Sequence, residues 1–223
     1  MIIAIDGHSS CGKSTIAKSL AMKLGFVYVD TGAMYRAITV YCIQHGLIIQ
    51  NTVHEHELRK HISNISISFQ AISNTKDFEQ ATYLNGVNVE KEIRGIEVSE
   101  HVSMISSLDF VRHTLVEKQR EYGKKNNVVM DGRDIGTVVF PHADYKFFIT
   151  ASVNVRAQRR YDELTAKGEK VAYNDIYKNI EKRDYIDSTR KESPLRQAKD
   201  AIVLDNSSMT RKEQLQWILK KIT

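Results

Sequence analysis

Cysteine and proline are scarce in this chain of 223 residues, which contains two of each. The two cysteines, Cys11 and Cys42, are too few for a disulfide framework, which favours a reducing compartment. No apolar run approaches the length that a membrane-spanning helix needs. Met1 leads directly into an apolar segment that has the pattern of a core strand, so we expect no signal peptide, no membrane association and a cytoplasmic location.

Aromatic residues are also few, at 8% of the chain, and they are not interleaved with basic residues as in a platform for single-stranded nucleic acid. The formal net charge is +5 and the sequence pI is about 9.1, which leaves a nucleic-acid-binding module as one hypothesis. Such a module would bind a polymer with an affinity that falls steeply with salt. A basic cleft for small phosphorylated molecules explains the same charge without a polymer.

The first 24 residues have the order of a strand, a loop and a helix. Residues 2–5 are Ile-Ile-Ala-Ile, a β-branched run typical of a strand buried on both faces. Residues 7–14 then match the Walker A pattern Gly-x-x-x-x-Gly-Lys-Ser, and residues 16–24 continue with helical periodicity. The pattern therefore stands in the structural context that it needs to bind phosphate.

The residue types of this loop fit a nucleoside triphosphate. Glycines at its ends allow the backbone N–H groups to converge on phosphate oxygens, aided by the positive end of the following helix. Lys13 would bring a charge to the β- and γ-phosphates, and the Ser14 hydroxyl would be placed for Mg²⁺. The residues predicted to bind the triphosphate are Gly7, His8, Ser9, Ser10, Cys11, Gly12, Lys13, Ser14 and Thr15.

Short apolar strands alternate with helical segments along the rest of the chain. The predicted core strands cover residues 2–5, 26–29, 127–131, 145–149 and 201–204. This alternation predicts an α/β fold of the P-loop type, with a doubly wound five-stranded parallel sheet and helices on both faces. Residues 65–69 and 83–89 instead alternate polar and apolar side chains around the turn signal Asn85-Gly86, so we expect a small antiparallel β insertion at residues 62–92.

Acidic and arginine residues follow the predicted strands. Asp131 ends one strand, where P-loop proteins place an acid near Mg²⁺, although aspartate is also a common turn residue. Guanidinium groups bind phosphate through two parallel hydrogen bonds, so an arginine-rich lining favours an acceptor that carries its own phosphate. Each arginine alone could equally solvate a helix face. The arginines in question are Arg36, Arg112, Arg133, Arg156, Arg159, Arg160, Arg183 and Arg190.

Three histidines, His54, His56 and His61, lie close together in the sequence. They could form a metal site, but their spacing places His54 and His56 on different faces of a helix. A solvated polar surface is the favoured interpretation.

Two stretches carry a resemblance to a known family: Asp30-Thr-Gly-Ala-Met-Tyr-Arg36 and Asp131-Gly-Arg-Asp-Ile-Gly-Thr-Val-Val-Phe-Pro141. In both, the chain resembles the bacterial cytidylate kinases, and further matches at residues 92–94, 111–120, 156–160, 182–184 and 190 extend the resemblance over essentially the whole chain. The resemblance implies in-line transfer of the γ-phosphoryl group of ATP, with Mg²⁺, to CMP or dCMP, which belongs to pyrimidine nucleotide metabolism. It also implies a monomer that acts on small-molecule nucleotides.

The resemblance further implies one P-loop kinase domain, residues 1–223, in three regions. The core would comprise about 1–30, 123–152 and 191–223, the monophosphate-binding region about 31–122 and the lid about 153–190. By similarity, Thr31, Arg36 and Arg133 would hold the CMP phosphate, Ser103, Arg112 and Asp134 would contact cytosine, and Arg183 and Asp187 would contact the sugar and neighbouring groups. Residues 7–15 would bind ATP, the catalytic set would be Lys13, Arg156, Arg160 and Arg190, and the metal would be held by Ser14 and, through water, Asp131.

The chain departs from the family pattern at His8, where the family usually has proline, and at Cys11, where it usually has alanine or glycine. We expect a change in loop stiffness and thiol sensitivity, with activity retained. Tyr185 and Ile186 also stand where the family is often more charged. Another monophosphate kinase, of the UMP, AMP or shikimate type, would share the loop and fold. A P-loop GTPase is disfavoured because the chain lacks an Asn/Thr-Lys-x-Asp guanine motif.

Overall fold

The computed structural model describes residues 1–72 and 79–222. The chain divides into two compact units. The first consists of Met1–Val29 with Tyr122–Thr223, and the second of Asp30–Glu121. In the part of the chain that the structure describes, no helix is long and apolar enough to cross a membrane.

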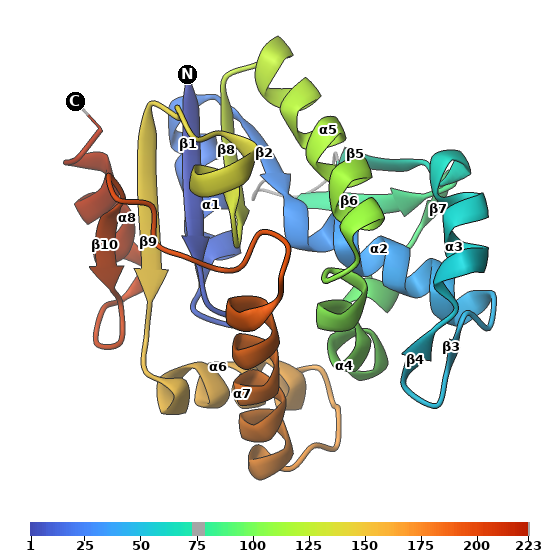
Figure 1. Ribbon diagram of the computed structural model, residues 1–223. Coiled ribbons are helices and arrows are strands. Elements are labelled where there is room, and N and C mark those ends of the chain that lie inside the picture. The colour runs from blue at the N-terminus through green and yellow to red at the C-terminus, as the bar shows by residue number, and fades with distance from the viewer. Residues whose placement is uncertain (73–78, 223) are drawn as a thin grey trace. The chain divides into compact units, whose positions relative to one another are not determined.

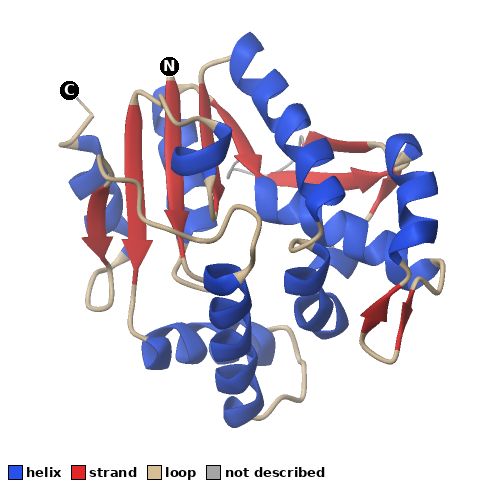
Figure 2. Ribbon diagram, in the orientation of Figure 1, coloured by secondary structure: helices blue, strands red, loops and turns tan. Residues whose placement is uncertain are grey.

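The first unit is built on a five-stranded sheet (Figures 1 and 2). In spatial order its strands are β10 (Ile202–Asp205), β9 (Tyr145–Thr150), β1 (Ile2–Gly7), β8 (Val128–Gly132) and β2 (Val27–Asp30). Strand β1 is central and pairs in parallel with both β8 and β9. The parallel α/β fold predicted from the apolar runs is confirmed, and the carboxyl ends of these strands share one edge.

Helices of the first unit fall into two groups. Helix α1 (Lys13–Leu24) packs against β8 and α8 (Arg211–Leu219). Helices α6 (Val153–Ala166) and α7 (Tyr173–Thr189) pack on each other (Figure 1). The latter pair has its own small apolar core, in which Ala157 and Ile180 are almost fully buried. The region that resembles a lid is therefore a helix pair stabilised by its own contacts.

The second unit is centred on helix α2 (Thr31–Gln44), most of whose side chains are buried. Its other helices are α3 (Glu55–His61), α4 (Ile96–Ile105) and α5 (Asp109–Lys125), the last of which continues into the first unit. Two short 3₁₀ turns cover Ile62–Asn64 and Glu92–Arg94. One apolar cluster joins these helices to the strands of the same unit, so α2 is anchored on most of its circumference.

A three-stranded antiparallel sheet lies in the second unit, formed by β5 (Ile67–Ile72), β6 (Glu79–Leu84) and β7 (Val87–Asn88). Asn85 and Gly86 connect β6 to β7 with φ angles of 50° and 81°, the conformation of a two-residue hairpin turn. The predicted antiparallel insertion is thus confirmed.

The sequence predicts one or two polar helical turns over residues 53–61 and no hairpin before them. The structure instead has β3 (Ile48–Ile49) and β4 (Thr52–Val53), and α3 begins at residue 55. Gln50 and Asn51 form the turn with φ angles of 47° and 59°. Because this turn has no glycine, its left-handed backbone gives only a weak sequence signal.

Candidate active site

The loop between β1 and α1 has the backbone of an anion-binding site. Gly7 has a φ angle of 149°, and a Cβ there would lie 2.0 Å from the carbonyl oxygen of Ile149, so only glycine fits. Gly12 and Ser10 also have positive φ angles, 90° and 58°. The loop leads directly into α1 at Lys13, which places the positive end of the helix dipole at the loop. The loop therefore has a backbone conformation that suits an anion.

Lys13 is held within this loop. Its Nζ donates a hydrogen bond of 2.6 Å to the carbonyl oxygen of His8 and lies 3.7 Å from the Sγ of Cys11. Burial and the charge of Arg133 lower the pKa of Lys13, against the opposing effect of acidic neighbours. A poorly hydrated ammonium group interacts strongly with phosphate, since little water has to be displaced.

Ser14 and Asp131 bring a hydroxyl and a carboxylate group together at the start of α1. The Ser14 hydroxyl donates to Asp131 Oδ2 at 2.9 Å, and the Tyr28 hydroxyl donates to Asp131 Oδ1 at 2.9 Å. Hydroxyl and carboxylate oxygens are the ligands that Mg²⁺ prefers, so these residues fit the metal implied by the sequence. Tyr28 was missed because an aromatic residue in an apolar strand has no pattern that separates it from the core.

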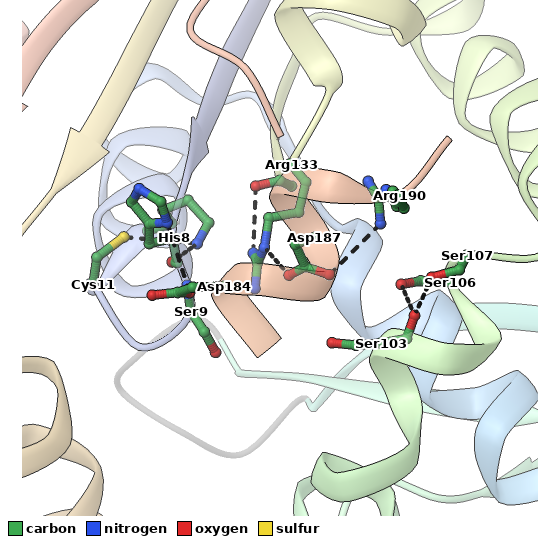
Figure 3. Close-up of polar contacts among 12 residues, drawn as sticks. His8, Ser9, Cys11, Ser103, Ser106, Ser107, Arg133, Asp184, Asp187 and Arg190 are labelled. Atoms are coloured by element: carbon green, nitrogen blue, oxygen red, sulfur yellow. Dashed lines mark hydrogen bonds and ion pairs between the residues drawn. The ribbon is translucent and has the colours of Figure 1, made fainter. Parts of the chain in front are cut away.

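Asp187, an acidic residue on α7, contacts predicted arginines in the first unit (Figure 3). Arg133 Nε donates to Asp187 Oδ2 at 2.8 Å, and Arg190 Nη1 lies 3.7 Å from Asp187 Oδ1. Burial alone would raise the pKa of Asp187, but the charges of Arg133, Arg190 and Arg183 outweigh it and hold that pKa below its usual value. The structure thus brings Asp187 close to three arginines that the resemblance assigns to CMP binding or to catalysis.

A second acidic residue of α7 contacts the phosphate loop (Figure 3). Asp184 Oδ1 accepts a hydrogen bond of 3.2 Å from Ser9 N and lies 3.6 Å from His8 Nδ1. Arg156 Nη1 donates to Asp184 Oδ2 and to the carbonyl oxygen of Ser9. Partial burial would raise the pKa of Asp184, but His8 and Arg156 outweigh that effect and hold it at about 2. Asp184 had no predicted role.

Two further arginines of α6 are engaged within the protein. Arg160 forms an ion pair of 3.0 Å with Glu163 one turn further along the helix. Arg159 binds Asn206 through both the side chain and the main chain of that residue. Arg159 therefore has protein partners for both of its terminal nitrogens.

In the second unit, the amino end of α2 carries two predicted phosphate ligands, Thr31 and Arg36. Asp30 caps this helix by accepting from Ala33 N at 2.9 Å, and Arg94 Nη2 donates to Asp30 Oδ2 at 3.0 Å. Burial would raise the pKa of Asp30, but Arg94 and Arg36 outweigh it and lower the pKa. The structure thus fixes the start of α2 through Arg94, which sequence reasoning gave no specific role.

Ser103 and Arg112 lie in the same unit and are both buried. The carbonyl oxygen of Ser103 accepts from the hydroxyls of Ser106 and Ser107 (Figure 3), and Arg112 Nη1 donates to the carbonyl oxygen of Ser106 at 3.1 Å. The Arg112 guanidinium also lies 5.2 Å from the centre of the Tyr35 ring. The buried Ser103 hydroxyl has no hydrogen-bond partner among the described residues. Such a group is suited to a ligand that supplies one.

Asp6 is a buried carboxylate beneath a π-helical turn at Ile135–Val139. Its two oxygens accept hydrogen bonds from Ile135 N at 2.8 Å and Gly136 N at 2.7 Å. This contact fixes the backbone immediately after Asp134, itself buried and predicted to contact cytosine. Burial raises the pKa of Asp6 to about 7, with a further contribution from Asp134, against the effects of the two N–H groups and Lys13.

We expect Asp6 to make folding stability depend on pH. Because its pKa of about 7 in the folded state exceeds the ordinary 3.8, its contribution is complete below the ordinary value and is lost as pH rises through 7. The loss could reach about 4 kcal/mol. Urea unfolding between pH 5 and 8 should show wild type losing stability relative to Asp6→Asn as pH rises, and parallel curves would contradict this account.

The three histidines of the segment His54-Glu-His-Glu-Leu-Arg-Lys-His61 are all exposed. His56 pairs instead with the adjacent Glu57 at 3.2 Å. Among residues 1–72 and 79–222, no cluster of three or more His, Cys, Asp or Glu could hold a metal ion.

The fold and these contacts define a class of protein: a parallel α/β phosphotransferase with a Walker A loop, a buried loop lysine and an arginine-rich site. The cytidylate kinase family model matches residues 3–223, and the chain belongs to the cytidylate kinase family. It is therefore a nucleotide kinase that acts on small molecules, which sets aside the GTPase and the nucleic-acid-binding module.

Individual relatives agree with the family model. The chain is 60% identical over 221 residues to a cytidylate kinase of Parabacteroides distasonis, covering 99% of this chain and 96% of the relative. It is 56% identical over 222 residues to a cytidylate kinase of Porphyromonas gingivalis, covering 99% and 95%. A cytidylate kinase of Bacteroides fragilis is 54% identical over 217 residues, covering 97% and 94%. The similarity thus includes every segment that carries a predicted site residue.

Proposed function

We propose that this protein transfers the γ-phosphoryl group of Mg-ATP to CMP and dCMP, giving ADP with CDP or dCDP by in-line displacement. The observation that carries the proposal is the match to cytidylate kinases over essentially the whole chain. A cytoplasmic location, a monomeric state and a role in pyrimidine nucleotide metabolism are parts of the same proposal.

The phosphate loop, residues 7–15, would bind the ATP phosphates through its backbone N–H groups and Lys13. Ser14 and, through water, Asp131 would hold Mg²⁺, which neutralises charge on the phosphate oxygens when it is bound. This assignment is supported by the positive φ angles of the loop and by the hydrogen bond between Ser14 and Asp131.

Acceptor recognition would divide into phosphate, base and sugar contacts. Cytosine presents an amino donor beside two acceptors, so a carboxylate and nearby donors can pair with it. The buried Ser103 hydroxyl, for which no protein partner is seen in the described chain, supports a base contact. In full, Thr31, Arg36 and Arg133 would bind the phosphate, Ser103, Arg112 and Asp134 the base, and Arg183 and Asp187 the sugar and neighbouring groups.

Catalysis would rest on positioning and charge compensation. Lys13, Arg156, Arg160 and Arg190 would offset charge on the transferred group as the lid region closes. An already ionised phosphate acceptor needs no general base to deprotonate it. Exclusion of water matters more, because hydrolysis of ATP is the competing reaction.

A coupled assay of ADP release with Mg-ATP tests this proposal, with CMP, dCMP, UMP, AMP and GMP offered separately. We expect kcat/KM for CMP and dCMP to exceed that for AMP and GMP by at least about 100-fold, because mismatched bases leave buried polar groups unpaired. The same assay without an acceptor measures background hydrolysis. ADP release that is independent of the acceptor, or highest with a purine nucleotide, would contradict the proposal.

A further inference from the structure

Asn206 is a fully buried polar residue for which the proposed reaction gives no role. It is the first residue after β10, and its backbone N–H donates to the carbonyl oxygen of Thr150 at the end of β9. Its main chain is therefore fixed at the carboxyl edge of the parallel sheet. Because a buried carboxamide needs partners for all its donors and acceptors, the contacts of Asn206 identify the groups that it holds in place.

Every polar group of the Asn206 side chain is used. Its Nδ2 donates to the carbonyl oxygen of Cys11 at 2.8 Å and to Gln214 Oε1 at 3.0 Å, while its Oδ1 accepts from Arg159 Nη1 at 2.9 Å. Arg159 Nη2 also donates to the Asn206 carbonyl oxygen at 2.8 Å. Gln214 Nε2 donates to the carbonyl oxygen of Met209, so Gln214 presents its oxygen to Asn206. These partners define one orientation of the carboxamide.

The contact with Cys11 determines the direction of a phosphate-loop amide. The carbonyl of Cys11 and the N–H of Gly12 belong to one planar trans peptide, in which they point in opposite directions. When Asn206 binds that carbonyl, the Gly12 N–H is directed away from Asn206. Gly12 has a φ angle of 90° and precedes the first residue of α1, so this peptide lies outside the helix, and Asn206 is the partner of its carbonyl oxygen. A phosphate-binding loop depends on such preset amide directions, because they need not reorganise when the anion arrives.

We propose that Asn206 is a positioning residue for ATP: its carboxamide holds the Cys11–Gly12 peptide in the orientation that binds phosphate, and Arg159 and Gln214 hold the carboxamide. The inference rests on the proposed function in one respect, that the loop binds the triphosphate of ATP. The proposal explains why Arg159 of α6 donates its hydrogen bonds to Asn206. The competing account is that the cluster only joins α6, β10 and α8.

The test uses Asn206→Asp in the full chain. The carboxylate keeps the size of the side chain and its bond to Arg159, but it cannot donate to Cys11 or Gln214. Calorimetric titration with Mg-ATP alone should show a dissociation constant raised about 10–100-fold, whereas KM for CMP changes less than about threefold. Thermal unfolding confirms that the variant is folded at the assay temperature. Asn126→Asp, an exposed amide with a local main-chain bond, is the matched control and should bind Mg-ATP as wild type does.

Arg159→Lys provides a second test, needed if Asn206→Asp does not fold. Lysine keeps the charge, but it lacks the two terminal nitrogens with which Arg159 binds both the side chain and the main chain of Asn206. We therefore expect the affinity for Mg-ATP to fall threefold to tenfold, which corresponds to about 1 kcal/mol. The KM for CMP should be unchanged. Unchanged Mg-ATP affinity in a folded Asn206→Asp protein, or in Arg159→Lys where the first variant is unfolded, overturns the proposal. Equal weakening of ATP and CMP also overturns it, since a merely structural role would affect both.

Failure of this inference can be told apart from failure of the proposed function. Mg-ATP binding is measured without any acceptor, whereas the function is tested by turnover of CMP in wild type. A wild-type protein that binds Mg-ATP but does not phosphorylate CMP, with weaker binding in Asn206→Asp, leaves the positioning role intact and removes the function. Normal CMP turnover in wild type, together with unchanged Mg-ATP binding in Asn206→Asp, would support the proposed function and overturn the positioning role.

Discussion

Lys13→Ala should lower kcat for phosphoryl transfer by about 10²–10⁴-fold, because one charge on the transferred group contributes roughly 3–5 kcal/mol in a water-excluded site. The side chain is 5% exposed and its ammonium group is held by the carbonyl oxygen of His8, so it is already placed in the loop. Steady-state kinetics with saturating ATP and CMP measure the effect. A variant within tenfold of wild type would contradict the role assigned to Lys13.

The matched control is Lys23→Ala in the last turn of the same helix, where the side chain is exposed. It removes the same charge and side chain without reaching the phosphate loop. We expect its kcat to stay within about twofold of wild type, since an exposed surface charge has little effect at a distance. The comparison separates the local role of Lys13 from the loss of one positive charge.

Asp187→Asn should lower the free energy of unfolding at pH 7 by about 2–4 kcal/mol, because it leaves buried arginines without their counter-charge. Asp187 is 3% exposed and pairs with Arg133 and Arg190. Its lowered pKa means that the ion pairs stabilise the fold above the ordinary pKa of an aspartate and lose that effect as pH falls through the folded-state value. Urea unfolding should therefore show a gap between wild type and variant at pH 7 that narrows in acid.

Glu181→Gln is the control for this prediction, because it removes a carboxylate from an exposed position of the same helix. We expect a change within about 0.5 kcal/mol, as for most surface substitutions. If Asp187→Asn costs no more than Glu181→Gln, the buried arginine cluster does not depend on Asp187. If its cost is the same at pH 7 and in acid, the ionised carboxylate is not the stabilising group.

Local patterns predicted most of the fold. The apolar runs identified all five parallel strands because strands buried on both faces need continuous apolar residues. Asn85-Gly86 identified a hairpin because those residue types adopt positive φ angles readily. The hairpin at Gln50 and Asn51 escaped prediction because its two-residue strands are too short for a periodicity, and no glycine marks the turn.

The site was predictable where its residues are contiguous and unpredictable where partners come from distant segments. The phosphate loop is one continuous motif, and its conformation agrees with the motif. The contact between Asn206 and Cys11 joins residues 195 positions apart, and that between Asp184 and Ser9 joins residues 175 apart. No periodicity links such pairs, because the topology of the sheet and the packing of the helices bring them together.

The sequence also could not predict the partner of each individual arginine. Arg133 and Arg159 carry the same charge, but Arg133 follows strand β8 and Arg159 lies within helix α6. In the structure, Arg133 donates a hydrogen bond to Asp187 in the candidate site. Arg159 instead donates to Asn206, which binds the Cys11 carbonyl oxygen of the phosphate loop. Composition could therefore predict an anionic ligand, but it could not assign each guanidinium group to the ligand or to the protein.

The most direct test of the account follows the transferred phosphoryl group itself. ATP labelled in its γ-phosphate is incubated with the protein, CMP and Mg²⁺, and the nucleotides are separated by chromatography. The account predicts that the label appears in CDP in an amount equal to the ADP formed, and that little is released as inorganic phosphate when CMP is omitted. Release of the label as inorganic phosphate at the same rate with and without CMP, with none in CDP, would contradict it.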